Sequence, residues 1–173
     1  MSISTSDMTS ASTSGATGGA TQTAPAAEAA VVAMPFAKAL NAGLRAAMAA
    51  DDHVLMMGED IGKLGGVFRV TEGLQAEFGD RRVLDTPLAE SGIVGTAIGL
   101  AMAGFRPVVE IQFDGFVFPA FDQITTQRAK LTNRLAGAAS FPVVIRIPYG
   151  GHIGAIEHHQ ESPETYFAHT PGL

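Results

Sequence analysis

Short apolar runs alternate with segments of helical spacing along this chain, and this alternation restricts its fold more than any other feature. A run of four to eight mainly apolar residues, closed by polar or turn residues, is typical of a buried strand. Four runs of this kind predict strands: HVLMMGED (53–60), RVLD (82–85), PVVEIQF (107–113) and PVVIRIPYG (142–150).

The segments between these runs carry helical patterns. Apolar residues at four-residue spacing follow Pro35 and predict a first helix: Phe36, Leu40, Leu44 and Met48. Three further helices are predicted over residues 73–79, 91–103 and 119–136, and Gly104 ends the second of them. Strands that alternate with helices predict an α/β fold, in which a mostly parallel sheet carries helices on both faces.

Ligands of parallel α/β sheets bind beyond the carboxyl ends of the strands. Three polar or glycine-rich segments follow predicted strands at that edge: GEDIGKLGG (58–66), DTPLAES (85–91) and PYGGHIGAIEHHQES (148–162). The functional site is therefore expected among these three segments.

Glu90 is the one ionisable residue within residues 86–104, and it stands where a predicted helix of small residues begins. A carboxylate near the positive end of a helix gains ~0.3–1 kcal/mol, which is one explanation. The other begins with three glycines that cost roughly 1 kcal/mol each relative to alanine and are tolerated where another backbone approaches closely: Gly92, Gly95 and Gly99. A carboxylate in such a place would leave water, its charged form would be disfavoured, and its proton would be available to a ligand nitrogen.

Polar and aromatic residues follow the third predicted strand. Gln112, Phe113, Asp114 and Phe116 lie at or beyond its carboxyl end. A flat aromatic ring there could stack on a planar heterocycle. The alternative is that the phenylalanines of this region simply form core: Phe113, Phe116, Phe118 and Phe121.

Three histidines and two glutamates crowd the segment HIGAIEHHQE: His152, Glu157, His158, His159 and Glu161. A metal site is a weak interpretation, because the HExxH spacing is absent and adjacent histidines point in different directions on any regular element. A single histidine that acts as an acid or base is better supported. A pair of histidines on a surface loop is the alternative.

Charge and composition exclude several classes of function. The net charge of −6 and the lack of a basic block argue against a nucleic-acid partner. No apolar run approaches the ~18 residues that a membrane span needs, so no membrane association is expected. The first basic residue is Lys38, which leaves no positive region for a signal peptide, and the cytoplasm is the expected location.

Two regions of the sequence set further expectations. Residues 1–30 are rich in Ser, Thr, Ala and Gly, lack large apolar groups, and are predicted to be a disordered tail. Neither GxxxxGK[ST] nor GxGxxG occurs, so the chain is not expected to hold a phosphate group alone. Because TYFAHTPGL carries no clear terminator, the sequence is expected to be a fragment of a longer chain.

Four motifs occur in order: MGEDIGKLGGVFRVTEGL, RVLDTPLAESGIVGTAIGLAMAGFRPVVEIQF, FPAFDQI and HHQESPETYFAHTPGL. Together they resemble the β subunit of the thiamine-diphosphate-dependent 2-oxoacid dehydrogenase E1 component, from about Phe36 to the end of the sequence. EIQFDGFVFPAFDQI and HHQESPETYFAH are more similar to the branched-chain (2-oxoisovalerate) type than to the pyruvate type. The resemblance implies a pyrimidine-binding, transketolase-like domain over residues 31–173, incomplete and without the family's C-terminal domain.

The resemblance also implies roles for individual residues. The family glutamate that matches Glu90 hydrogen-bonds N1′ of the thiamine diphosphate aminopyrimidine and promotes deprotonation of thiazolium C2. Phe116 is expected to stack on the pyrimidine, and Gln112 to line its pocket. His159, which fits the His-x-x-Ser pattern, is expected to assist acyl transfer to the lipoyl arm, although His158 could be confused with it.

No Gly-Asp-Gly…Asn motif is present in this sequence, so the chain is expected to ligate no metal itself. The family's α subunit carries that motif, with the Mg²⁺ that holds the diphosphate. The expected assembly is therefore an α₂β₂ heterotetramer that acts on a 2-oxoacid, docks on a lipoyl-bearing E2 acyltransferase, and leaves this chain inactive alone. The alternatives are another transketolase-like thiamine enzyme or a non-catalytic fragment that only binds an α-like partner.

Overall fold

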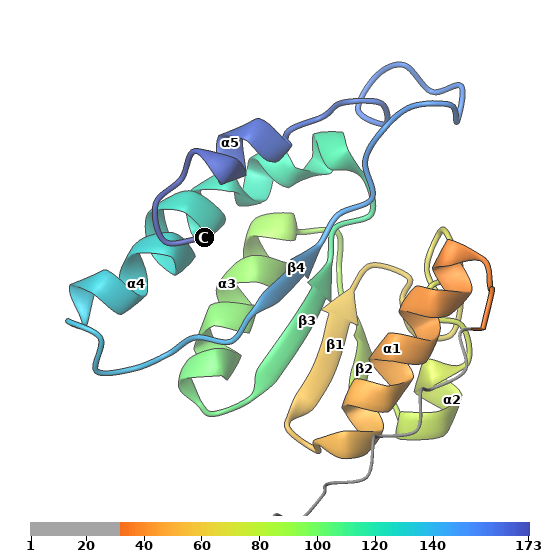
Figure 1. Cartoon of the computed structure of the whole chain (residues 1–173), viewed down its shortest axis with the longest axis horizontal. Helices are drawn as coiled ribbons and strands as arrows, with labels where there is room; N and C mark the ends of the chain where they lie inside the picture. The colour runs from red at the N-terminus through yellow and green to blue at the C-terminus, as the bar shows by residue number, and fades with distance from the viewer. Residues whose placement is uncertain (1–31) are drawn as a thin grey trace, which may run out of the picture. The chain divides into compact units, whose positions relative to one another are not determined.

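The computed structural model describes residues 32–173, and the tail predicted over 1–30 lies outside the described residues. Met34–Leu173 form one unit around a four-stranded sheet with the order β2-β1-β3-β4 (Figure 1). Every adjacent pair of strands is parallel, which confirms the predicted α/β fold. The strands are β1 (Val54–Gly58), β2 (Val83–Asp85), β3 (Arg106–Glu110) and β4 (Val144–Arg146).

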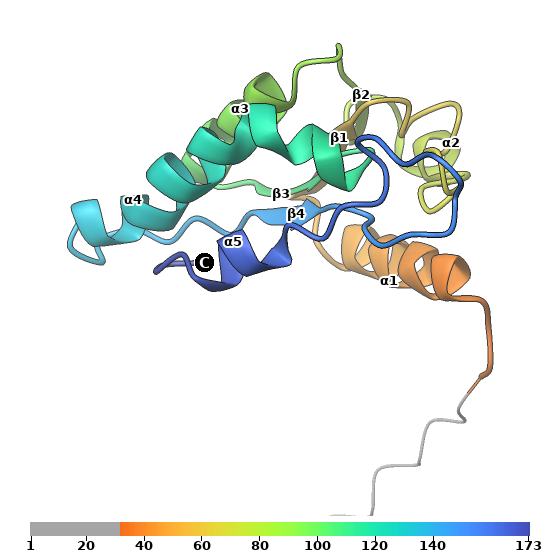
Figure 2. The ribbon, with the colours of Figure 1, turned by 90° about the horizontal axis from the view of Figure 1, so that it is seen from above.

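Helices cover both faces of this sheet. Helix α1 (Phe36–Ala50) lies on one face, and α3 (Glu90–Met102) with α4 (Ala129–Arg134) lies on the other (Figure 2). Two five-residue helices complete the order, α2 (Leu74–Phe78) before β2 and α5 (Glu164–Ala168) after β4. None of the helices within residues 32–173 combines the length and apolarity needed to cross a bilayer.

The strand β1 is buried along its whole length because its side chains pack into two separate hydrophobic cores. Leu55 and Met57 point into the core under α3, whereas Val54 and Met56 point into the core under α1, as the two-residue period of a strand requires. Fully burying such a side chain contributes about 1.5–3 kcal/mol. A continuous apolar run is thus what a central parallel strand needs.

Helix α3 buries one side and exposes Gly92 and Gly99, whereas Gly95 is half-buried. Its buried residues are mainly branched aliphatics and alanines: Ile93, Val94, Ala97, Ile98 and Ala101. A Cβ on Gly92 would meet only the Ala89 side chain, and a Cβ on Gly99 would meet nothing within 4 Å. A Cβ on Gly95 would lie 3.4 Å from the side chain of Gln123, so the described part of this chain makes no close backbone approach at any of the three glycines.

The prediction of one regular helix over 119–136 is wrong in two respects: where the helical structure starts, and its being a single type of helix. Helical structure begins earlier, as the 3₁₀ segment η1 (Asp114–Ala120), continues through the π-helical segment η2 (Gln123–Arg128), and ends as α4. Pro119 lies within η1, and because proline has no N–H to donate and its ring clashes with the carbonyl of residue i−4, it disfavours a regular α-helix here. The Thr125 hydroxyl donates to the Phe121 carbonyl oxygen (2.8 Å), a local bond that bends helices.

Candidate functional site

Parallel pairing brings the carboxyl ends of three strands to one edge of the sheet. Glu59 directly follows β1, Gln112 follows β3 by two residues, and Glu90 is reached from β2 through a four-residue turn. Gly62 N–H donates to Asp85 Oδ1 (2.6 Å) and thereby joins the loops that follow β1 and β2. The sequence placed the site at this edge, and the structure gathers its polar side chains there.

Glu90 is the first residue of α3 and is only 7% exposed. The helix gives its carboxylate the positive end of a macrodipole, while the fold removes most of its water. Glu90 thus has both features that the sequence suggested: its carboxylate stands at the positive end of a helix, and it is withdrawn from water.

Glu59 is a second buried acid that sequence analysis did not single out. Its side chain is 6% exposed, and among the described residues its Oε1 has no hydrogen-bond partner. Burial raises the pKa of its carboxyl, the negative charges of Glu90 and Asp60 raise this pKa further, and a hydrogen bond with the Ala89 backbone opposes part of the rise. The signal that could have found it is an acid placed directly after a fully apolar strand.

Gln112 is hydrogen-bonded to the two acids that follow β1. Its Nε2 donates to Asp60 Oδ2 (3.1 Å) and, at 3.4 Å, to the Glu59 carbonyl oxygen. The amide side chain therefore belongs to the acidic group formed by Glu59, Asp60 and Glu90.

Three rings form an aromatic group: Phe113, Phe116 and His159. This group is next to the acidic group, because Phe113 directly follows Gln112. The ring centroid of His159 lies 4.2 Å from that of Phe113 and 5.2 Å from that of Phe116, and the two phenylalanine rings are 5.8 Å apart. All three pairs meet edge to face, the preferred geometry of aromatic rings. The structure thus brings Phe116 and His159 together.

The four phenylalanines considered as core divide between two places. Phe116 contacts the core under α3 and keeps part of its ring exposed, so both interpretations apply to it. Phe118 and Phe121 instead meet Tyr166 of α5, with centroid distances of 6.2 and 5.8 Å.

The histidines are distinguished by their contacts. His159 Nδ1 lies 2.6 Å from the Glu157 carbonyl oxygen, and because a carbonyl only accepts, Nδ1 carries the hydrogen in this contact. Its Nε2 is then the nitrogen that remains to accept a proton. His158 is farther from Phe116 (6.3 Å) and has a positive φ of 62°, and His152 is exposed on the loop with φ of 80°.

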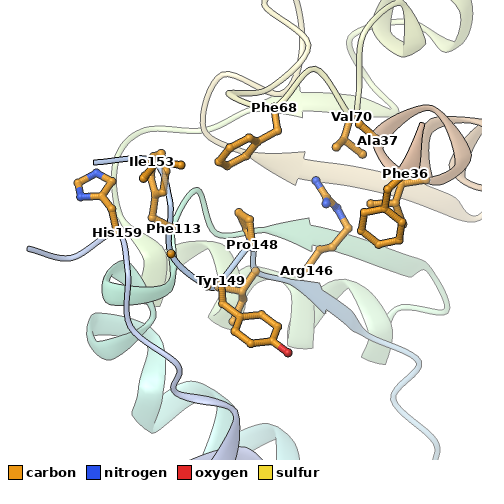
Figure 3. Close-up of a pocket in the computed structure, with 14 residues that line it drawn as sticks. Phe36, Ala37, Phe68, Val70, Phe113, Arg146, Pro148, Tyr149, Ile153 and His159 are labelled. Atoms are coloured by element: carbon orange, nitrogen blue, oxygen red, sulfur yellow. The ribbon is translucent and has the colours of Figure 1, made fainter. Parts of the chain in front are cut away.

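A pocket of about 500 Å³ extends from this aromatic group toward α1 (Figure 3). Phe113 and His159 lie at one end of it, and Phe36 and Arg146 lie at the other. Its lining is mostly apolar and does not include Glu90. The acidic group therefore lies outside this pocket, and the aromatic group lies between the two.

Arg146 forms a largely buried ion pair with Glu110 on the adjacent strand. Glu110 is 2% exposed, and burial raises the pKa of its carboxyl, while the charge and the hydrogen bond of Arg146 oppose that rise. Its ion pair with Glu110 therefore holds Arg146 in place at that end of the pocket.

The acidic group suits a ring with a basic nitrogen better than it suits a metal ion or a phosphate. Within residues 32–173, no group of three His, Asp or Glu side chains is placed to hold a metal ion. Residues 59–63 and 85–90, at the carboxyl ends of β1 and β2, carry one cation, Lys63, and four carboxylates: Glu59, Asp60, Asp85 and Glu90. An anion would be repelled there, whereas a nitrogen that accepts a proton would find a buried acid.

The family model described as "Transketolase, pyrimidine binding domain" matches residues 32–173. Over 146 residues the chain is 75% identical to the pyruvate dehydrogenase E1 component subunit beta of Leifsonia xyli. The matched segment covers 84% of this chain and 43% of that relative.

Two further relatives are less similar, and one of them carries a different name. The 3-methyl-2-oxobutanoate dehydrogenase subunit beta of Mycobacterium tuberculosis is 57% identical over 136 residues, covering 79% of this chain and 39% of that protein. The pyruvate dehydrogenase E1 component subunit beta of Staphylococcus aureus is 53% identical over 140 residues, covering 81% of this chain and 43% of that protein. The chain therefore spans less than half the length of these curated relatives.

Proposed function

Because the chain belongs to the family of transketolase pyrimidine-binding domains, we propose that it forms the aminopyrimidine half of a thiamine diphosphate site in the β subunit of a 2-oxoacid dehydrogenase E1 component. The observation that carries the proposal is the buried acid Glu90 at the start of α3, beside the second acid Glu59 and the amide of Gln112. Residues 31–173 would be an incomplete domain of that subunit.

Glu90 is proposed to hydrogen-bond the pyrimidine ring nitrogen and to share its proton with it. Burial makes this contact stronger than it would be in water. Gln112 would line the ring's edge, and Phe116 would stack on its face. When bound, thiamine diphosphate supplies the carbon nucleophile and the electron sink for decarboxylation of a 2-oxoacid.

The diphosphate end is proposed to be held by the α subunit, together with Mg²⁺. The four carboxylates at the strand edge support this division, because they disfavour a polyanion on this chain. The site would then be complete only in an assembly such as α₂β₂, and this chain alone would be inactive.

His159 is proposed to assist transfer of the acyl group to the lipoyl arm of an E2 acyltransferase. Its Nδ1 contact with the Glu157 carbonyl oxygen leaves Nε2 to exchange a proton, which is the function such a transfer needs. The ring also borders both the proposed stacking residue Phe116 and the apolar pocket.

Two observations bear on the side chain of the substrate. The segment 110–124 resembles the branched-chain type, which favours a branched 2-oxoacid, whereas the relative with 75% identity is named for pyruvate. Decarboxylation of pyruvate and of 3-methyl-2-oxobutanoate by the full-length protein with its α subunit, compared as kcat/KM, would decide between them.

Thiamine diphosphate binding tests the proposal as a whole. Calorimetric titration with Mg²⁺ present should show tight binding to the mixture of full-length protein and α subunit, and much weaker binding to either alone. Equal binding by this chain alone would contradict the proposed half-site. A fragment that only binds the α subunit would associate with it and leave the cofactor titration unchanged.

A further inference from the structure

The loop that carries His159 is a separate surface segment. It runs from Pro148, two residues after β4, to Pro163, just before α5, and its two ends meet where Gly150 N–H donates to the Glu161 carbonyl oxygen (3.4 Å). Its middle is mostly exposed and includes residues with a positive φ. Such a loop needs an attachment to the fold if one of its side chains is to keep a fixed position.

That attachment is at Gly115. Among the described residues, one backbone hydrogen bond joins the tip of the loop to the rest of the fold, and it runs from Gly115 N–H to the His158 carbonyl oxygen (3.1 Å). The same N–H also lies 2.8 Å from Oδ1 of Asp114, a fully buried carboxylate at the start of η1. The receiving side of the contact is therefore part of the buried framework.

Gly115 also lets the loop approach unusually closely. A Cβ at this position would lie 2.4 Å from the Cα, 2.7 Å from the carbonyl oxygen and 2.8 Å from the carbonyl carbon of His158. These are backbone atoms, so no side-chain rotation can relieve the overlap. The φ of Gly115 lies outside the left-handed region, so the requirement for glycine here is one of space and not of backbone conformation.

The next residue along the loop is His159, whose ring lies edge to face against Phe113 and Phe116. A shift of the His158 backbone would be passed directly to that ring. We infer that Gly115 is a positioning residue for His159, because its lack of a side chain seats the loop on η1 and holds the imidazole in the aromatic group. The inference rests on the proposed function only where it treats His159 as the histidine of acyl transfer.

Replacing Gly115 with alanine tests this placement in the 173-residue chain. In the unmodified chain, NMR should show His159 ring protons shifted by the ring currents of the two phenylalanines, and the amide of residue 115 should exchange at least about tenfold more slowly than an exposed amide. Gly115→Ala should remove most of the His159 shift and speed that exchange by about tenfold. Gly43→Ala is the matched control, since a Cβ there would meet nothing within 4 Å.

Unshifted His159 signals or fast exchange at residue 115 in the unmodified chain would overturn the inference, even if the alanine variant failed to fold. Wild-type signals in a folded Gly115→Ala variant would overturn it as well. In the full-length protein with its α subunit, the same variant should slow acyl transfer by about 10²-fold and change decarboxylation less. If the His159 signals move and acyl transfer does not, the placement stands and the proposed role of His159 fails.

Discussion

The negative charge of Glu90, the first residue of α3, contributes to the raised pKa of Glu59 in the loop after β1. Neither acid is adjacent in sequence to the other, and the parallel pairing of β1 with β2 brings their loops together. Several measurable consequences follow from this and from the other contacts of the fold.

Replacing Glu59 with Gln should stabilise the chain at neutral pH. The pKa of Glu59 is higher in the folded than in the unfolded state, so the unfolded state loses its proton first as the pH rises. Stability therefore falls through the range between these two pKa values, and glutamine removes that loss. Urea unfolding from pH 3.5 to 8 should show no gain at the acid end and a gain at neutral pH. A constant difference across this range would contradict the assigned cause.

Replacing Glu90 with Gln should lower decarboxylation by about 10²–10⁴-fold, because glutamine keeps the shape and cannot share an acid proton. The measurement uses the full-length protein with its α subunit, and gel filtration should show unchanged assembly. Glu164→Gln is the control, since Glu164 is exposed on α5. A rate near that of the unmodified enzyme would refute the role.

Replacing His159 with Ala should slow acyl transfer to a lipoyl domain more than it slows decarboxylation. His169→Ala is a suitable control because His169 is exposed and has an ordinary φ of −88°. His158→Asn tests the neighbouring assignment, since asparagine tolerates the positive φ found there. Equal losses in both steps for His159→Ala, or a larger loss for His158→Asn, would count against His159.

Replacing Arg82 with Ala should destabilise the fold by about 2–3 kcal/mol, because hydrogen bonds from a charged donor contribute ~1.5–3 kcal/mol each and water replaces part of them. The Arg82 guanidinium donates to three backbone carbonyl oxygens that join α1 to β1: those of Met48, Asp51 and Val54. Arg81→Ala is the control for loss of charge, since Arg81 is exposed. Equal midpoints of urea unfolding for the two variants would disprove the assigned role.

Replacing Arg146 with Met should destabilise the chain by about 3–5 kcal/mol at pH 7, because it leaves the carboxylate of Glu110 buried and unpaired. The raised pKa of Glu110 should rise further without its cation, so the loss should shrink as the pH falls and the acid takes up a proton. Adding Glu110→Gln should restore much of the stability at pH 7. Additive losses in this double-mutant cycle would show that the pair does not interact.

The sequence predicted the parallel sheet because apolar runs and helical spacing depend on local pattern, and the positions of β1 and α3 follow from that pattern. It missed Glu59 because an acid after a strand has no distinctive neighbours until β2 is paired beside it. It misplaced the start of the helical segment before α4 because hydrogen bonding around Pro119 and Thr125 depends on packing. Proximity of His159 to Phe113 and Phe116 also could not be read from pattern, since the loop reaches them through Gly115.

The Arg82 contacts and the acidic group lie at opposite ends of the same strands. Arg82 precedes β2 and bonds to the residue that opens β1, whereas Glu59 and Glu90 follow the carboxyl ends. Changes made for stability at one end and for cofactor binding at the other share no partners, so their free-energy effects should sum. Laboratory evolution of this protein could therefore select substitutions for the two properties separately and then combine them in one chain.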